Sequence, residues 1–295
     1  MSKVFRRHNR KTKETIFTNP ITMNVKPFIS KRSKIFAIGS CFALEVIKYL
    51  GKKGYTVLNK EFTKDTDHNL IWYNTYSILY EFERAAGLFK QNKNDIWKVK
   101  NNKFQDPYRR CVLSDTKKEL RKTINILDQK IKTYIETCDI IIITLGLVEV
   151  WKKSDNNRII CVIPGHPRGA GGGQDSTFKF LTYDENLQNM RDSLNILNKI
   201  NNCRVIITTS PVPLAQTFRK MDHLVANTES KSILRAVCGQ LEREFKNVTY
   251  YPAYEMATNF PKSKVFKADG RHVQPDFISK IMNHFENHFC IKETR

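Results

Sequence analysis

The sequence predicts an α/β protein, a three-layer α/β/α sandwich built around a central parallel sheet of the flavodoxin-like kind. Short apolar runs typical of buried strands alternate along the chain with longer amphipathic segments that predict helices. With 295 residues, of which 40% are hydrophobic, the chain is long enough to bury a substantial core. Its longest apolar stretch, centred on 140–145, is far too short to cross a bilayer, so no membrane span is expected.

The first βαβ unit is the clearest local signal. The apolar run 35–39 ends in glycine, as a buried parallel strand does where it turns into a helix. The apolar positions of 44–50 then give one helical face, which closes at Gly51. The run 55–58 repeats the strand signal and completes the unit.

The rest of the chain continues the alternation. Strands are predicted over 140–145, 204–209 and 248–251, and helices over 75–89, 115–137, 184–200, 227–245 and 275–290. All five strands should lie in one parallel sheet. We expect a basic arm over 1–31, followed by one α/β domain over 32–295 with a helical insertion at about 75–137.

Charge and cysteine usage narrow the function classes. Fifty Lys and Arg residues stand against 29 Asp and Glu residues, a net charge of +21 that attracts anions. We therefore expect an anionic small molecule or an acidic glycan as partner; the absence of a recognised motif argues against nucleic acid. The seven scattered cysteines form no CxxC pair and indicate free thiols in the cytoplasm, with no metal site. The oligomeric state is left open.

Candidate site residues follow the predicted strands. Active sites of open parallel sheets gather at the carboxyl ends of the strands. The residues at these positions are Ser40 and Cys41 after the first strand, Gly146 and Glu149 after the run 140–145, and Ser210 after the run 204–209.

Asp269 and His272 lie three residues apart shortly before the last helix. Together with a nucleophile on a tight strand-to-helix turn they would form an acyl-transfer constellation. The histidine would take a proton from the nucleophile, and the aspartate would hold the imidazole in the required tautomer.

These motifs have a family resemblance. Residues 38–43 spell IGSCFA, and the chain resembles the GSCFA family of the SGNH (GDSL-like) hydrolase superfamily. The resemblance continues through 73–75, 106–109, 144–146 with Glu149 and Trp151, 209–213, Asn227 with Ser230 and Lys231, 251–255 and 269–272. It implies the three-layer fold and ester chemistry.

The resemblance also bears on the nucleophile. In the superfamily's G-D-S-L motif the serine stands two residues after the glycine, and counting from Gly39 puts Cys41 in that slot. A cysteine at a helix N-terminus beside a histidine is expected to have a lowered pKa. Cys41 is therefore favoured over Ser40, and both remain candidates.

Members of the superfamily complete an oxyanion hole with the nucleophile's own N–H, a glycine and an asparagine. Gly146 matches the glycine that precedes this asparagine, but Val148 fills the asparagine slot. Asn74 is the candidate side-chain donor in its place. Asn227 and Lys231, near the start of a helix, are candidates for contact with substrate.

The function expected from these features is ester chemistry through a covalent acyl-enzyme. An acyl group, most simply acetyl, would be transferred to or hydrolysed from a carbohydrate hydroxyl during bacterial polysaccharide or glycan biosynthesis. Transferase and esterase are not separated by the sequence. No permanently bound cofactor is expected, and acyl-CoA is the candidate donor. The alternative, motivated by Val148, is a catalytically degenerate module that binds an anionic polymer.

Overall fold

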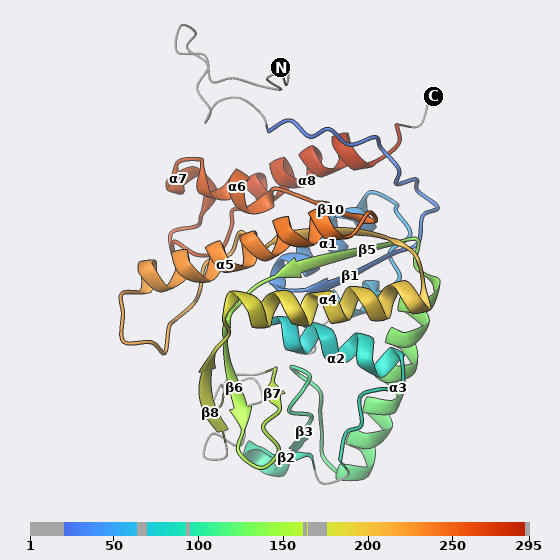
Figure 1. Ribbon diagram of the computed structural model, residues 1–295, viewed down its shortest axis with the longest axis vertical. Coiled ribbons are helices and arrows are strands. Elements are labelled where there is room, and N and C mark those ends of the chain that lie inside the picture. Colours follow the sequence, from blue (N-terminus) through green and yellow to red (C-terminus); the bar gives the residue numbers. More distant parts are fainter. Residues whose placement is uncertain (1–20, 64–69, 93–94, 162–163, 165–175, 293–295) are drawn as a thin grey trace, which may run out of the picture.

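The computed structural model describes residues 21–63, 70–92, 95–161, 164 and 176–292, so most of the predicted basic arm lies outside it. A four-stranded parallel sheet in the order β1-β5-β9-β10 lies at its centre (Figure 1). The strands are β1 (Ile35–Gly39), β5 (Ile140–Leu145), β9 (Arg204–Thr209) and β10 (Val248–Tyr250). This sheet, covered by helices on both faces, confirms the predicted fold class.

The fifth predicted strand, 55–58, is wrong as a regular strand. The segment lies beside β1 but forms only an isolated parallel bridge between Ile35 and Val57. At Ala37 the Asn59 side chain takes over the pairing, because its Oδ1 accepts from Ala37 N at 3.3 Å and its Nδ2 donates to Ala37 O at 2.8 Å. With this segment at the edge, the order along the sheet is that of flavodoxin-like folds.

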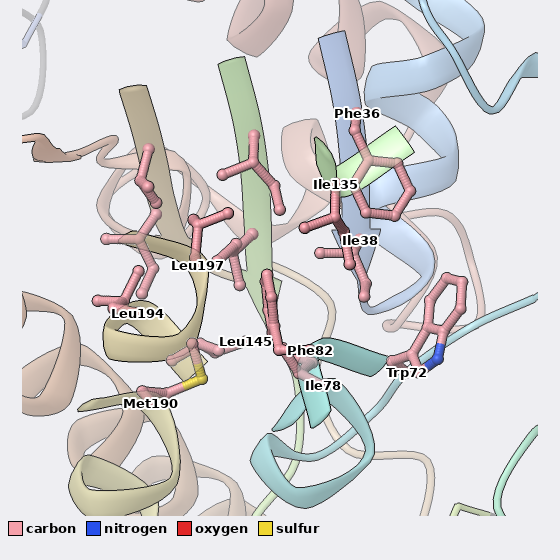
Figure 2. Packing of buried hydrophobic residues seen from close by; sticks show 14 of the residues in the cluster. Phe36, Ile38, Trp72, Ile78, Phe82, Ile135, Leu145, Met190, Leu194 and Leu197 are labelled. Carbon is pink, nitrogen blue, oxygen red and sulfur yellow. The ribbon is translucent and has the colours of Figure 1, made fainter. Parts of the chain in front are cut away.

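The two faces of the sheet carry two hydrophobic layers, because successive side chains of a strand point to opposite sides. Phe36, Ile38, Ile141 and Ile143 belong to the layer shown in Figure 2. The helices of that layer are α2 (Thr75–Ala85), α3 (Lys117–Thr137), α4 (Tyr183–Ile200) and α5 (His223–Glu244). On the opposite layer lie α1 (Cys41–Lys52), α6 (Ala253–Thr258), α7 (Lys262–Val265) and α8 (Pro275–Phe289).

The stretch 75–137, expected as a helical insertion, contains a small sheet between its two helices. The strands β2 (Trp97–Lys98), β3 (Phe104–Gln105) and β4 (Leu113–Ser114) pair in an antiparallel manner. Helix α2 ends at Ala85 rather than at the predicted residue 89. Gly87 has a φ of +73°, and Leu88 N donates back to Glu83 O at 2.7 Å, which closes the helix in the manner of a glycine C-cap.

A second antiparallel sheet, which the sequence analysis did not predict, follows β5. Its order is β7-β6-β8, with β6 (Glu149–Lys153), β7 (Ile159–Ile160) and β8 (Ser176–Phe180). In Figure 1 this sheet lies away from the central one, at the end where β5 terminates. Two short 3₁₀ helices, 60–63 and 100–102, complete the elements of the described residues.

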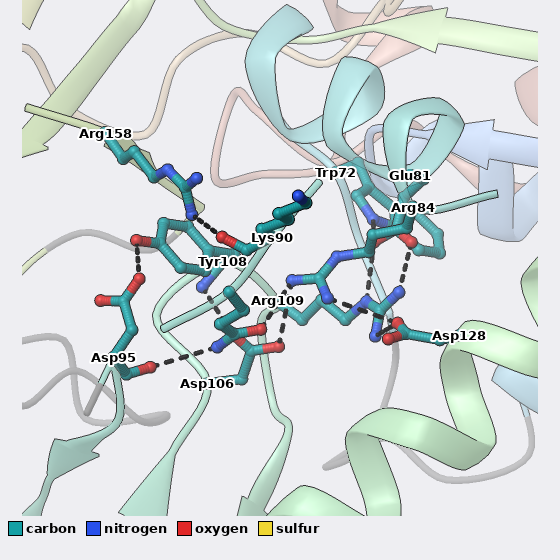
Figure 3. Close-up of polar contacts among 11 residues, drawn as sticks. Trp72, Glu81, Arg84, Lys90, Asp95, Asp106, Tyr108, Arg109, Asp128 and Arg158 are labelled. Carbon is teal, nitrogen blue, oxygen red and sulfur yellow. Dashed lines mark hydrogen bonds and ion pairs between the residues drawn. The ribbon is translucent and has the colours of Figure 1, made fainter. Parts of the chain in front are cut away.

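A buried ionic network fixes the segment between β3 and β4 (Figure 3). The Arg109 guanidinium is fully buried, contacts Glu81 Oε1 at 2.8 Å and Oε2 at 2.5 Å, and pairs with Asp128 at 2.6 Å. Trp72 Nε1 also donates to Glu81 Oε1, at 2.8 Å. Burial alone would raise the pKa of Glu81, but Arg109 keeps this pKa below its usual range. The network thereby sets the direction of the next residue, Arg110.

None of the helices in the described ranges is long and apolar enough to cross a membrane.

The close contact between the ends of β1 and β5 generates a stability prediction. Gly39 has a φ of +130°, and a Cβ there would lie 2.2 Å from Thr144 O. Gly39→Ala should therefore lower the free energy of unfolding by more than about 3 kcal/mol, measured by urea denaturation. Gly54→Ala is the control, because Gly54 also has a positive φ, +80°, but has open space around it, so the cost should be about 1 kcal/mol. Equal losses in the two variants would contradict the steric explanation.

Candidate functional site

The turn from β1 into α1 separates the two candidate nucleophiles. Ser40 is the N-cap of α1: its Oγ accepts from Phe42 N at 3.3 Å and contacts Thr144 Oγ1 at 2.9 Å. Ser40 is only 2% exposed, so its hydroxyl is occupied inside the fold. Cys41 is the first residue of α1 and is half-buried, whereas the other six cysteines are buried. Of the two candidates, Cys41 is therefore the more accessible.

A pocket of about 150 Å³ opens at the carboxyl edge of the central sheet. It brings together most of the residues that the sequence placed at this edge: Ser40, Cys41, Asn74, Gly146, Glu149, Ser210 and Lys231. Trp151 and Phe218 form an aromatic wall, with ring centroids 4.5 Å apart in an edge-to-face arrangement. Asn227, Asp269 and His272 do not line the pocket.

The segment before α2 is tied to the two strand ends. Trp72 N donates to Gly39 O at 2.8 Å, and Leu147 N donates to Tyr73 O at 2.7 Å. Gly146 is needed here, because a Cβ would lie 2.9 Å from Tyr73 O. The next residue, Asn74, is the N-cap of α2, and its Oδ1 accepts from Ser77 N at 2.9 Å. The amide nitrogen of Asn74 is then the group that it can offer to a substrate.

Lys231 reaches the pocket from α5 and is only 1% exposed. Its Nζ donates to Gly146 O at 3.0 Å, and no carboxylate of the described residues pairs with it. Burial, helped by the positive charge of Arg271, lowers the pKa of Lys231 to about 8, while the Cys41 thiolate would act in the opposite direction. Lys231 is thus a buried cation whose charge is not balanced by an acid.

The pKa of Cys41 contradicts the expectation from its position at a helix N-terminus. Burial raises the pKa of the Cys41 thiol above its usual value, and the nearby charges of Lys231 and Arg271 only partly offset this. Desolvation of the thiolate therefore outweighs the favourable field. Cys41 needs a base or further charge stabilisation before it can attack as a thiolate.

Asp269 and His272 form the hydrogen-bonded pair that their spacing suggested. The His272 Nδ1 lies 2.5 Å from Asp269 Oδ2, and Asp269 Oδ1 accepts from the backbone N–H groups of Arg271 and His272 at 3.0 Å. These hydrogen bonds keep the pKa of Asp269 well below its usual range, and the bond from the His272 imidazole contributes most. The pair is exposed, and the residue of this loop that lines the pocket is Arg271. Arg271 Nη1 lies 3.4 Å from His272 Nε2, so the guanidinium stands beside the imidazole nitrogen that would act as base.

Three predicted site residues hold the loop that forms one wall of the pocket. The Glu149 carboxylate accepts from the Thr217 hydroxyl at 2.7 Å, Phe218 N at 2.9 Å and Arg219 Nε at 3.0 Å. Ser210 Oγ accepts from Val212 N at 3.4 Å, and Asn227 Oδ1 accepts from Leu214 N at 3.0 Å. Their described contacts position the segment 210–219.

Two cations of the pocket, Arg110 and Arg271, were missed as site residues. Arg110 directly follows the motif 106–109, and Arg271 lies inside the motif 269–272. The only sequence signal for either arginine is its position next to charged residues of a motif, Arg109 for Arg110 and His272 for Arg271. Val148 is fully buried in the hydrophobic core, so this position supplies no side-chain donor to the pocket.

The fold and pocket define an α/β protein whose candidate site lies at the carboxyl ends of its parallel strands, with a half-buried thiol in its lining. The chain belongs to the GSCFA family, whose model matches residues 34–285. That match covers the whole central sheet and every predicted site residue. No curated protein matches the chain. Among the described residues, no group of three or more His, Cys, Asp and Glu side chains could hold a metal ion.

The exposure of Cys41 predicts its reactivity. Iodoacetamide should label Cys41 before the six buried thiols, and peptide mass spectrometry after a short exposure should show this order. Because burial raises the pKa of Cys41, the labelling rate should still be rising above pH 9, beyond the range of a free thiol. Cys41→Ala is the control and should leave the native protein without fast labelling. Fast labelling of another cysteine would contradict the prediction.

The unbalanced charge of Lys231 predicts that the site lowers stability. Its pKa in the fold, about 8, lies below the 10.5 of the unfolded chain, so the charged form disfavours folding at pH values below 8, and the penalty fades between 8 and 10.5. Lys231→Met, despite losing the bond to Gly146 O, should raise the free energy of unfolding near neutral pH by about 1–3 kcal/mol. Urea denaturation in a buffer without multivalent anions measures this. The gain should disappear at high pH; a gain independent of pH would point to packing instead.

Proposed function

We propose that this protein is an enzyme of ester chemistry that carries an acyl group on Cys41 and passes it to, or removes it from, a carbohydrate hydroxyl. The single observation that supports the proposal most directly is the accessible thiol of Cys41 at the first turn of α1, inside a pocket at the carboxyl edge of the sheet. Membership of the SGNH superfamily is part of this proposal, and the order of the central sheet is compatible with it.

The proposed reaction has two steps. Cys41 Sγ attacks the acyl carbonyl carbon, the S–C bond forms, and the bond from the acyl carbon to the leaving group of the donor breaks as the thiol proton passes through a base to that group. In the second step an acceptor hydroxyl, or water, attacks the thioester and regenerates the thiol. A hydroxyl makes the enzyme a transferase, and water makes it an esterase.

Two kinds of group would assist these steps. We assign the base to His272, oriented by Asp269, because this pair lies on the loop whose Arg271 lines the pocket. Catalytic hydrogen bonds are often incomplete before the substrate binds, so the exposed position of His272 is compatible with this role. The N–H of Cys41 and the amide of Asn74 are the proposed oxyanion donors, and the charge of Lys231 favours the thiolate.

The size of the pocket and the chemistry of the chain suggest the substrates. A cavity of about 150 Å³ suits a small acyl group such as acetyl better than a long chain. We propose acyl-CoA as a donor, polysaccharide or glycan biosynthesis as the setting, and the cytoplasm as the location, since all seven cysteines are free thiols.

Mass spectrometry of the intact protein tests the covalent step. After incubation with acetyl-CoA or an activated acetyl ester, the native protein should gain the mass of one acetyl group, and hydroxylamine should remove it as it does a thioester. Cys41→Ala should abolish the adduct, because the attacking sulfur is missing.

Ser40→Ala is the matched variant for this experiment. Ser40 caps α1 and contacts Thr144, so its loss should lower stability by about 1 kcal/mol but leave acylation within about tenfold of the native rate. An adduct that persists in Cys41→Ala and disappears in Ser40→Ala would overturn the choice of nucleophile.

Burial of Val148 and the exposed position of His272 favour a second candidate, a binding module for an anionic polymer. This candidate expects no adduct with any donor, together with retention on an acidic polysaccharide that falls steeply as salt is added. Acylation of Cys41 by a donor at a rate above that of free cysteine would exclude it.

A further inference from the structure

Positive charge is concentrated in the pocket on side chains from three separate parts of the chain. Arg110 precedes β4, Lys231 belongs to α5, and Arg271 lies in the loop before α8. Arg110 is only 9% exposed and Lys231 only 1%. No carboxylate within the described ranges forms an ion pair with any of the three.

The acid in the pocket lining does not balance this charge. Glu149 already accepts from a hydroxyl, a backbone N–H and the guanidinium of Arg219, so its oxygens are committed to the wall of the pocket. The Nε of Arg271 is buried without a hydrogen-bond partner, and the Arg110 guanidinium lies over the ring of Tyr73, 6.0 Å from its centroid. These donors are therefore available to a ligand.

Elsewhere the chain pairs its buried cations. Arg109 contacts both Glu81 and Asp128, and Lys153 contacts Asp95. Burial of a cation without an acid is costly, and a fold that neutralises its other buried cations has no structural need for two unpaired ones, Arg110 and Lys231, in a pocket that also holds the partly exposed Arg271. The missing negative charge is then expected from outside the chain. The N-terminus of α1, whose first residue Cys41 lines the pocket, adds to the same positive field.

We propose that the pocket binds an oxyanion carried by the sugar substrate, a carboxylate or a phosphate, through Arg110, Lys231 and Arg271. The proposal rests on the carbohydrate substrate proposed above and makes it specific: the sugar is acidic rather than neutral. Guanidinium groups suit both oxyanions, because their N–H groups can donate in parallel to two oxygens.

The aromatic wall fits the rest of such a substrate. The rings of Trp151 and Phe218 meet edge to face beside the cations, and Phe218 is 46% exposed. Phe178, 38% exposed, extends this wall, with its ring centroid 5.6 Å from that of Trp151. The apolar face of a pyranose ring would pack on this surface while its charged group enters between the cations.

Calorimetric titration of the Cys41→Ala protein, which cannot turn over, tests the proposal at constant ionic strength. Glucuronic acid, glucose 6-phosphate and inorganic phosphate are the anionic probes, and glucose is the neutral one. At least one anionic sugar should bind with at least about tenfold higher affinity than glucose, since charge-assisted hydrogen bonds contribute more than neutral ones. A preference between glucuronic acid and glucose 6-phosphate identifies the oxyanion. The proposal would be overturned if glucose bound as tightly as both acidic sugars, or if none of the probes bound.

Variants separate this site from general attraction by a basic protein. Arg110→Gln and, independently, Arg271→Gln in the exposed loop should each weaken binding of the acidic sugar by about 10- to 100-fold. Arg32→Gln removes the same charge from an exposed position and should change it by less than about twofold. Equal weakening by all three would show a long-range effect and refute a site.

The outcome is independent of the acyl-transfer proposal. If an acidic sugar binds but no acyl adduct forms, the proposed anion site stands and the proposed acyl transfer is rejected. If Cys41 forms an acyl adduct but no anion binds, the proposed acyl transfer stands and the proposed anion site is rejected.

Discussion

The architecture of the site depends on a backbone contact between the ends of β1 and β5 that leaves no room for side chains. A Cβ on Gly39 would lie 2.2 Å from Thr144 O, and one on Gly146 would lie 3.0 Å from Ser40 Cβ. Because the strands approach so closely, the Ser40 hydroxyl meets Thr144 and caps α1, and the following thiol is turned into the pocket. The choice between the two candidate nucleophiles thus follows from packing at the strand ends rather than from their intrinsic chemistry.

Charge is handled differently in the core and in the pocket. Arg109 is buried against Glu81 and Asp128, whereas its neighbour Arg110 reaches the pocket without an acid. The paired arginine anchors the segment, so the unpaired one is held in place despite the cost of its desolvation. Lys231 is also buried without an acid. Burial disfavours its charged form, and that charge in turn favours a thiolate at Cys41. Residues kept at such a cost are typical of functional sites.

The regular core was predictable from the sequence, and the surroundings of the site were not. Continuous apolar runs predicted β1, β5 and β9, because strands buried on both faces need no polar alternation. The sheet formed by β6, β7 and β8 was not predicted, because β7 has only two residues and β8 lies largely at the surface. The segment 55–58 has the composition of a strand. Beside Ala37, however, the side chain of Asn59 forms the hydrogen bonds that the backbone of a regular strand would form. Of two adjacent arginines, no pattern tells which one faces the core.

Substrate binding and activation of the thiol place opposite demands on the same cations. The charges of Lys231 and Arg271 lower the pKa of Cys41, but an anion bound between them would cancel much of that field and leave the cost of burial. Once an acidic substrate is bound, the cations would therefore offset even less of the cost of burying the thiolate. A separate base is then required, and the loop that contributes Arg271 to the pocket also carries the hydrogen-bonded pair Asp269 and His272. Recognition of the anion and removal of the proton would then be coupled through one loop, because Nη1 of Arg271 lies 3.4 Å from His272 Nε2.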